Sequence, residues 1–153
     1  MKRILTATTV LAAMLAVFAS AQAEEKATKV EKVKCAVAGK EIKIADAKVA
    51  TYKSAKVYVC CGACKAKLEK TPAKFAVKAN HQLVLTGQAK QVNCPFAGKP
   101  ADKAKMVEMA GVKVAFCCGG CQGKAKAAKG DKQLELVFSD KAFAKGFKVT
   151  AKK

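Results

Sequence analysis

Apolar residues in this chain of 153 residues occur in short runs that are separated by lysine-rich polar segments. The runs at residues 49–52 and 57–59 flank a short polar turn and predict a β-hairpin. The runs at 106–109 and 114–116 flank a turn near Gly111 and predict a second hairpin. Each predicted hairpin leads directly into a group of cysteines, so both groups are expected at the end of a strand.

Helices are predicted after both cysteine groups. Alanine and lysine dominate residues 64–70 and 121–129, and both residue types favour helix. Thr71 and Pro72 predict a further helix start, with threonine as the cap and proline in the first turn. Phe75 is the expected apolar anchor of that helix.

Each half of the chain is expected to close with a short strand, at residues 83–85 and at 134–138. Ser139 and Asp140 predict the cap of a last short helix that carries Phe143. The predicted fold class is therefore α+β, with hairpins and helices in both halves.

The chain contains two copies of one unit. CAVAGK, which starts at Cys35, matches CPFAGK, which starts at Cys94, and KVYVCCGACKAK matches KVAFCCGGCQGK. All eight cysteines fall into this alignment, four in each copy. Each first motif contains a glycine, Gly39 or Gly98, which suits a turn with positive φ. An internal repeat of this kind predicts two domains, residues 24–87 and 88–153.

Residues 1–23 have the pattern of an export signal: a basic start, an apolar run and a small-residue ending, Ala21-Gln22-Ala23. The apolar run is shorter than the roughly 20 residues of a membrane-spanning helix, which disfavours a membrane anchor. We expect cleavage after Ala23 and an exported protein, periplasmic or secreted.

The formal net charge is +19, and it falls to +17 once Lys2 and Arg3 are removed. Arg3 is the only arginine, and the chain has no tryptophan and two tyrosines. Nucleic-acid binding proteins rely on arginine and on aromatic stacking, so no nucleic-acid partner is expected. The lysines predict a solvated surface, which could associate weakly with anionic surfaces.

Each copy is small and has few large apolar side chains, so it needs a metal or disulfides to hold a fold. A turn contributes the first cysteine, and a hairpin end plus a helix start contributes the other three. Four sulfur ligands suit zinc, or copper and other thiophilic metals. The candidate metal ligands are Cys35, Cys60, Cys61 and Cys64 in the first copy, and Cys94, Cys117, Cys118 and Cys121 in the second.

The thiolate is the form of cysteine that binds metal, and a helix N-terminus and nearby lysines lower the pKa of a thiol. Cys61 and Cys64 are expected at such a helix start, with Lys65 and Lys67 following. A lowered pKa is therefore expected for both thiols, and the lysines would offset the negative charge of a metal–thiolate site.

These motifs resemble the YHS and TRASH group of small metal-binding domains. The resemblance rests on C-x-x-x-G-K, a hairpin, CC-x-x-C and the Pro72–Phe75 element, which is present only in the first copy. It implies zinc-ribbon or treble-clef-like units and a link with heavy-metal sensing, trafficking or copper transport. The family ligands fall on two sets of residues: Cys35, Cys60 and Cys64, and Cys94, Cys117 and Cys121. Cys61 and Cys118 are not part of the family pattern.

Two alternatives remain open. Eight cysteines in an exported chain predict disulfides, and Cys61-Gly-Ala-Cys64 has the spacing of a redox dithiol. Clustering favours metal, because disulfides between near neighbours close almost no loop. A simple dithiol would not need Cys35, whereas a metal site would. His81 is expected at the surface, and Met106 and Met109 are expected in the core.

Catalysis is not expected, because the sequence contains no carboxylate pair, nucleophile–base set or phosphate loop. The sequence therefore predicts an exported, tandem-repeat metal-binding protein. Its metal would either stabilise each repeat or be cargo that the protein buffers or delivers.

Overall fold

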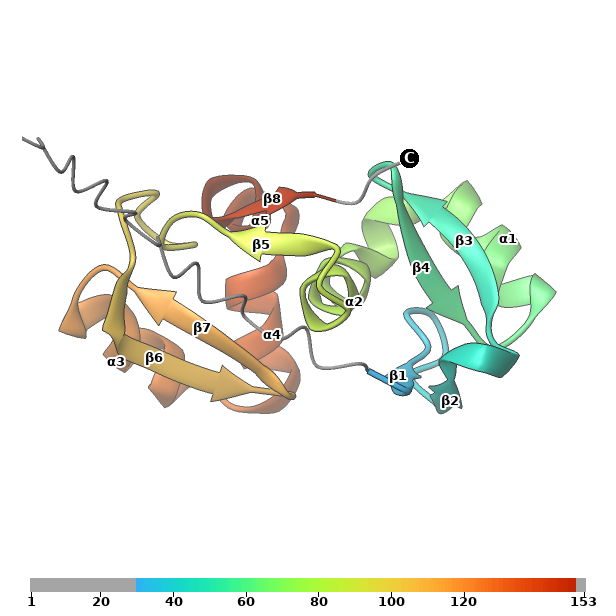
Figure 1. The fold of residues 1–153 in the computed structure, drawn as a ribbon, viewed down its shortest axis with the longest axis horizontal. Coiled ribbons are helices and arrows are strands. Elements are labelled where there is room, and N and C mark those ends of the chain that lie inside the picture. The colour runs from blue at the N-terminus through green and yellow to red at the C-terminus, as the bar shows by residue number, and fades with distance from the viewer. Residues whose placement is uncertain (1–29, 151–153) are drawn as a thin grey trace, which may run out of the picture.

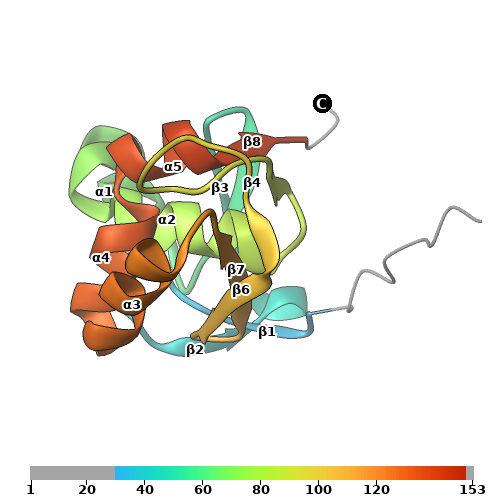
Figure 2. The ribbon, with the colours of Figure 1, turned by 90° about the vertical axis from the view of Figure 1, so that its left-hand side faces the viewer.

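The computed structural model describes residues 30–150, which form an α+β fold of short antiparallel hairpins and five α-helices (Figures 1 and 2). The predicted α+β class is confirmed. The predicted export signal, residues 1–23, lies outside the described residues. Across residues 30–150, each helix is too short or too polar to cross a membrane.

The first half of the described chain begins with two antiparallel strand pairs and ends with two helices. Lys48 of β3 lies opposite Val59 of β4, and Lys53 and Ser54 form the turn with positive φ angles of 50° and 61°. The first predicted hairpin is therefore confirmed. The elements are β1 (Lys32–Lys34), β2 (Glu41–Lys43), a 3₁₀-helix (Ile44–Asp46), β3 (Lys48–Tyr52), β4 (Ala55–Val59), α1 (Gly62–Lys70) and α2 (Pro72–Leu85).

The second half repeats the hairpin and the helix but closes differently. Ala110 and Gly111 form the turn of its hairpin, again with positive φ, which confirms the second predicted hairpin. The strand before its first cysteine pairs with the last strand of the chain, not with a neighbouring strand. The elements are β5 (Ala89–Gln91), β6 (Asp102–Met109), β7 (Val112–Phe116), α3 (Gly119–Ala127), α4 (Gly130–Phe138), α5 (Asp140–Gly146) and β8 (Phe147–Val149).

The two predicted closing strands are wrong, because both segments are helical. Residues 83–85 form the end of α2, and residues 134–138 lie in α4. In α2 the buried residues Ala76, Ala79 and Leu83 recur at helical spacing, so they form one apolar stripe. A short apolar run is compatible with both a strand and a buried helix. Here the helical spacing of buried residues over a longer segment decides for the helix.

The predicted helix starts are correct, but the predicted side-chain caps are not. α2 begins at Pro72, while the Thr71 hydroxyl donates to the Lys67 carbonyl at 3.0 Å and does not cap α2. α5 begins after Ser139, whose side chain also makes no capping hydrogen bond. Thr71 therefore closes α1 at the point where α2 starts.

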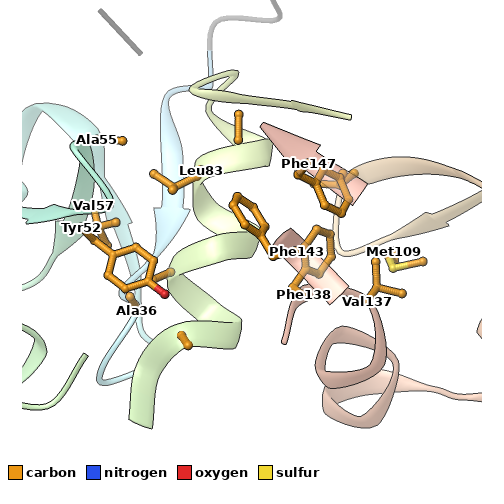
Figure 3. Packing of buried hydrophobic residues seen from close by; sticks show 14 of the residues in the cluster. Ala36, Tyr52, Ala55, Val57, Leu83, Met109, Val137, Phe138, Phe143 and Phe147 are labelled. Carbon is orange, nitrogen blue, oxygen red and sulfur yellow. The ribbon is translucent and has the colours of Figure 1, made fainter. Parts of the chain in front are cut away.

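Helix α2 is the last element of the first half and lies at the centre of the molecule. Helices α4 and α5 of the second half pack against it (Figure 1). Leu83 of α2 approaches Tyr52 and Val57 of the first hairpin, while Phe138 and Phe143 lie on its other side (Figure 3). These side chains belong to one buried apolar cluster that extends into the second hairpin. The core is therefore shared between the two halves.

A buried polar group also joins the halves. Asn80 of α2 is fully buried and donates to the Phe138 carbonyl at 2.9 Å and to Asp140 Oδ1 at 3.0 Å. Lys53 Nζ contacts Asn80 Oδ1 at 3.0 Å and Asp140 Oδ1 at 2.7 Å. Burial acts to raise the pKa of Asp140, but hydrogen bonds from Lys53, Asn80 and Tyr52 outweigh it and lower that pKa.

Replacing Asn80 with alanine is expected to lower the free energy of unfolding by about 2 kcal/mol, because it leaves buried polar partners without a hydrogen bond. Urea denaturation of the purified chain measures this change. Lys74→Ala, at an exposed position of the same helix, is the control and should change stability by less than about 0.5 kcal/mol. Equal stability of the two variants would contradict the assigned network.

Candidate metal centres

The first cysteine of each half lies in a tight turn with the same backbone hydrogen bonds in both halves. Gly39 N–H donates to the Cys35 carbonyl at 2.9 Å, and Gly98 N–H donates to the Cys94 carbonyl at 2.8 Å. The two glycines have φ angles of 72° and 68°, which glycine adopts without strain. These turns hold both cysteines fully buried.

The other cysteines follow the second strand of each hairpin. Cys60 comes directly after β4, Cys61 is the residue before α1, and Cys64 lies in the first turn of α1. Cys117, Cys118 and Cys121 have the same places relative to β7 and α3. In Figure 1, α1 and α3 lie at opposite ends of the molecule, so the two cysteine groups belong to separate halves.

The tertiary structure brings three sulfur atoms together in each half. The Sγ atoms of Cys35, Cys60 and Cys64 all lie within 4.8 Å of one another, and so do those of Cys94, Cys117 and Cys121. These six residues were predicted as ligands. The early cysteine of each half therefore joins its later partners, as a metal site requires and a simple dithiol does not.

The sulfur separations fit a tetrahedral metal site. Cys60 and Cys64 Sγ are 3.5 Å apart, and Cys117 and Cys121 Sγ are 3.8 Å apart. Zinc–sulfur bonds of about 2.3 Å place tetrahedral ligands about 3.8 Å apart. All eight cysteines lie within the described residues, and all are free thiols. The donor set therefore fits a thiophilic ion such as zinc or monovalent copper.

The second cysteine of each adjacent pair lies outside these triads. Cys61 and Cys118 are exposed, whereas Cys35 and Cys94 are fully buried. Cys61 Sγ is 3.8 Å from Cys60 Sγ, and Cys118 Sγ accepts a hydrogen bond from Cys121 N–H at 3.5 Å. Each triad thus has one further thiol at its solvent side.

In each turn, backbone hydrogen bonds favour the thiolate form of the buried cysteine. Burial acts to raise the pKa of Cys35, but backbone N–H groups outweigh this effect and lower it. Ala38 N–H donates to Cys35 Sγ at 3.3 Å, and Cys60 N–H donates to it at 3.4 Å. The pKa of Cys94 is lowered against burial in the same way.

The prediction of a lowered pKa for both helix-start thiols is half right. The pKa of Cys61 is lowered, chiefly by the backbone N–H of Cys64 at the start of α1. The pKa of Cys64 is instead raised to about 12, because burial and the neighbouring thiols disfavour its charged form. Cys121 in the second half has a pKa raised to about 12 for the same reasons.

Metal binding is expected to release protons, because the thiols with raised pKa are neutral in the metal-free protein near neutral pH. Each site should release at least about two protons, from Cys60 and Cys64 or from Cys117 and Cys121. Apparent zinc affinity should therefore rise at least about hundredfold per pH unit between pH 6 and 8. Proton release on Zn²⁺ addition in dilute buffer measures this, and Mg²⁺ is the control. Zinc binding without proton release would contradict thiolate ligation.

Two side chains outside the cysteine groups differ from expectation. Met106 is 44% exposed, so only Met109 is a core residue. His81 is half-buried and packs edge-on against Phe138 with ring centroids 5.1 Å apart, while its Nε2 lies 3.1 Å from the Ala110 carbonyl. Burial lowers the pKa of His81. No local sequence pattern predicts the exposure of Met106 or the burial of His81, because both depend on how the two halves pack.

Comparison of the chain with protein-family models, with curated proteins and with solved structures finds no match. The functional assignment therefore rests on the two thiol clusters and on their surroundings.

Proposed function

We propose that this is an exported metal-binding protein with one cysteine–thiolate site in each of two repeats, residues 24–87 and 88–153. The observation that supports it most is the pair of sulfur triads, built twice from the same turn, strand end and helix start. The proposed units are small zinc-ribbon or treble-clef-like domains, in line with the resemblance to the YHS and TRASH group. The proposed role is binding, not catalysis.

Zinc is the first candidate, and monovalent copper or another thiophilic ion is the second. Three sulfur atoms with a fourth thiol close by suit tetrahedral zinc, and three sulfur atoms alone suit monovalent copper. The turn that holds Cys35 provides two N–H donors to its sulfur, which favours a thiolate before the ion arrives. The proposed role of the metal is either to stabilise each repeat or to be cargo that the protein buffers or delivers outside the cytoplasm.

Metal analysis and thiol counting on protein recovered from the exported fraction test the proposal. We expect about two metal ions per chain, and the thiols of the two triads should become reactive only after chelation. Cobalt substitution should add sulfur-to-metal charge-transfer absorption, which reports thiolate ligation directly. Protein without metal and without reactive thiols would instead show that the cysteines form disulfides. Protein retained in the cytoplasm would contradict export.

A further inference from the structure

Each thiol cluster contains one cysteine at the surface beside a ligand of the buried triad. Cys61 follows Cys60 in the chain, and Cys118 follows Cys117. Cys61 and Cys118 are exposed, whereas the turn cysteines of the same clusters are fully buried. Both halves therefore combine an enclosed sulfur with a sulfur that solvent reaches.

Cys60 lies next to every other sulfur of the first cluster. Its Sγ is 3.5 Å from Cys64 Sγ and 3.8 Å from Cys61 Sγ, and its backbone N–H donates to Cys35 Sγ at 3.4 Å. The Cys61 sulfur is thus adjacent to Cys60 on the exposed side of the cluster, whereas the Cys35 sulfur is adjacent to Cys60 on the buried side. An ion that moved from Cys35 toward Cys61 would move toward solvent.

The approach to the exposed thiols is open. The residues that follow them are small and exposed: Gly62, Ala63, Gly119 and Gly120. A Cβ atom added to Gly62 or Gly119 would meet no atom within 4 Å, and one added to Gly120 would meet only Cys118 Sγ, at 3.9 Å. Another molecule can thus approach either thiol without displacing neighbouring protein atoms.

We propose that Cys61 and Cys118 are exchange thiols, which pass the metal ion between the triad of the same half and an anionic acceptor that carries thiols. This inference rests on the proposed function, and in it the metal ion is cargo that the protein delivers. It assigns to the second cysteine of each pair a role that differs from that of a fixed ligand.

The transfer proceeds by replacement of one metal–sulfur bond at a time. Cys61 sulfur bonds to the ion as the bond to Cys35 breaks, and the proton that Cys61 releases is taken up by Cys35. Acceptor thiols then bond to the ion one at a time, and the proton that each gives up is taken up by the protein sulfur that it replaces. The ion keeps its oxidation state, so the sequence needs neither an oxidant nor a reductant.

The charge around the clusters favours an anionic acceptor. Lys65 and Lys67 are exposed on α1 just after the first cluster, and Lys124 is exposed at the same place on α3. The whole chain has a formal net charge of +19, which attracts anions over long range. An anionic dithiol combines this charge with two sulfur ligands.

Metal transfer from the full chain loaded with Zn²⁺ to the anionic dithiol dimercaptopropanesulfonate tests the proposal. Rapid gel filtration at timed intervals, followed by metal analysis, measures the zinc that remains on the protein. The double variant Cys61→Ser and Cys118→Ser should keep about two zinc ions per chain but transfer them at least about tenfold more slowly. The matched control is Ala66→Ser with Ala127→Ser, at exposed positions of α1 and α3, and it should transfer at the wild-type rate.

Each other outcome has a distinct meaning. Transfer from the double variant at the wild-type rate, or faster, would overturn the exchange role and leave the metal sites intact. A double variant that holds no zinc would show that Cys61 and Cys118 are fixed ligands, which also overturns it. Failure of the wild-type chain to bind zinc, copper or cobalt would contradict the proposed function itself.

Alkylation of the unsubstituted protein provides a test that needs no variant. With Zn²⁺ bound, iodoacetamide should modify Cys61 and Cys118 first, while Cys35 and Cys94 should stay protected. Mass spectrometry of the digested protein identifies the modified residues. Equal protection of all eight cysteines would contradict an exchange role for the exposed pair.

Discussion

Replacing Cys35 with serine is expected to reduce the zinc content of the chain from about two ions to about one, because it removes one sulfur of the first triad. Structural zinc contributes about 10–16 kcal/mol of binding free energy, so the loss of one among three or four ligands amounts to roughly 3 kcal/mol or more. Affinity at that site should therefore fall more than about hundredfold. Isothermal titration of the metal-free chain with Zn²⁺ measures both quantities.

Two variants complete the Cys35 experiment. Cys94→Ser should have the same effect at the second site, because its turn has the same hydrogen bonds as that of Cys35. Ala45→Ser introduces serine at an exposed position of the first half and should retain both sites. If Cys35→Ser kept two zinc ions at wild-type affinity, the buried turn cysteine would not be a ligand and the triad assignment would fail.

Replacing Gly146 with alanine is expected to destabilise the second half and to weaken its metal site. A Cβ atom at Gly146 would lie 2.8 Å from the Cα atom of Pro95 and 3.0 Å from its nitrogen, which is closer than packed atoms allow. Pro95 follows the ligand Cys94, so relief of the clash must shift the turn that holds this sulfur. Overpacking of this kind costs about 1–3 kcal/mol, and the contact with backbone atoms places the loss toward the upper end.

The expected result for Gly146→Ala has two measurable parts. Urea denaturation should show the lower stability, and zinc titration should show a weaker second site with the first site unchanged. Gly123→Ala is the matched control, because a Cβ atom there meets nothing within 4 Å and alanine favours α3 by up to about 1 kcal/mol. If Gly146→Ala left both stability and zinc affinity unchanged, the packing of α5 would not constrain the turn that holds Cys94.

Local residue patterns were sufficient to predict the parts of the fold that local chemistry controls. Both hairpins were predicted because short apolar runs flank turn residues, and both post-cysteine helices because alanine and lysine favour helix. The segments 83–85 and 134–138 were mispredicted as strands, since their apolar runs are too short to reveal a period. The helical state of residues 83–85 depends on the stripe that Ala76, Ala79 and Leu83 of α2 present to the shared core, and α4 buries Val137 and Phe138 in the same core.

The candidate ligands were predicted from repetition, but their separate roles were not. Cysteine spacing within the chain does not decide between Cys60 and Cys61, and only the resemblance to the YHS and TRASH pattern favoured Cys60. The structure separates them: the backbone turns between β4 and α1, so Cys60 Sγ lies in the triad and Cys61 is exposed. The raised pKa of Cys64 was missed for a similar reason, because burial depends on tertiary packing and outweighs the helix start.

The sequence by itself determined the duplication, the eight sulfur atoms and the local elements that carry them, because each follows from residue types at short separation. Only the tertiary structure decided which three thiols meet in each half, which thiol remains at the surface, and how α2 joins the halves through Asn80 and a common core. The physical reason is that Cys35 and Cys60 are brought together by contacts across 25 residues, and long-range packing of this kind leaves no local pattern in the chain.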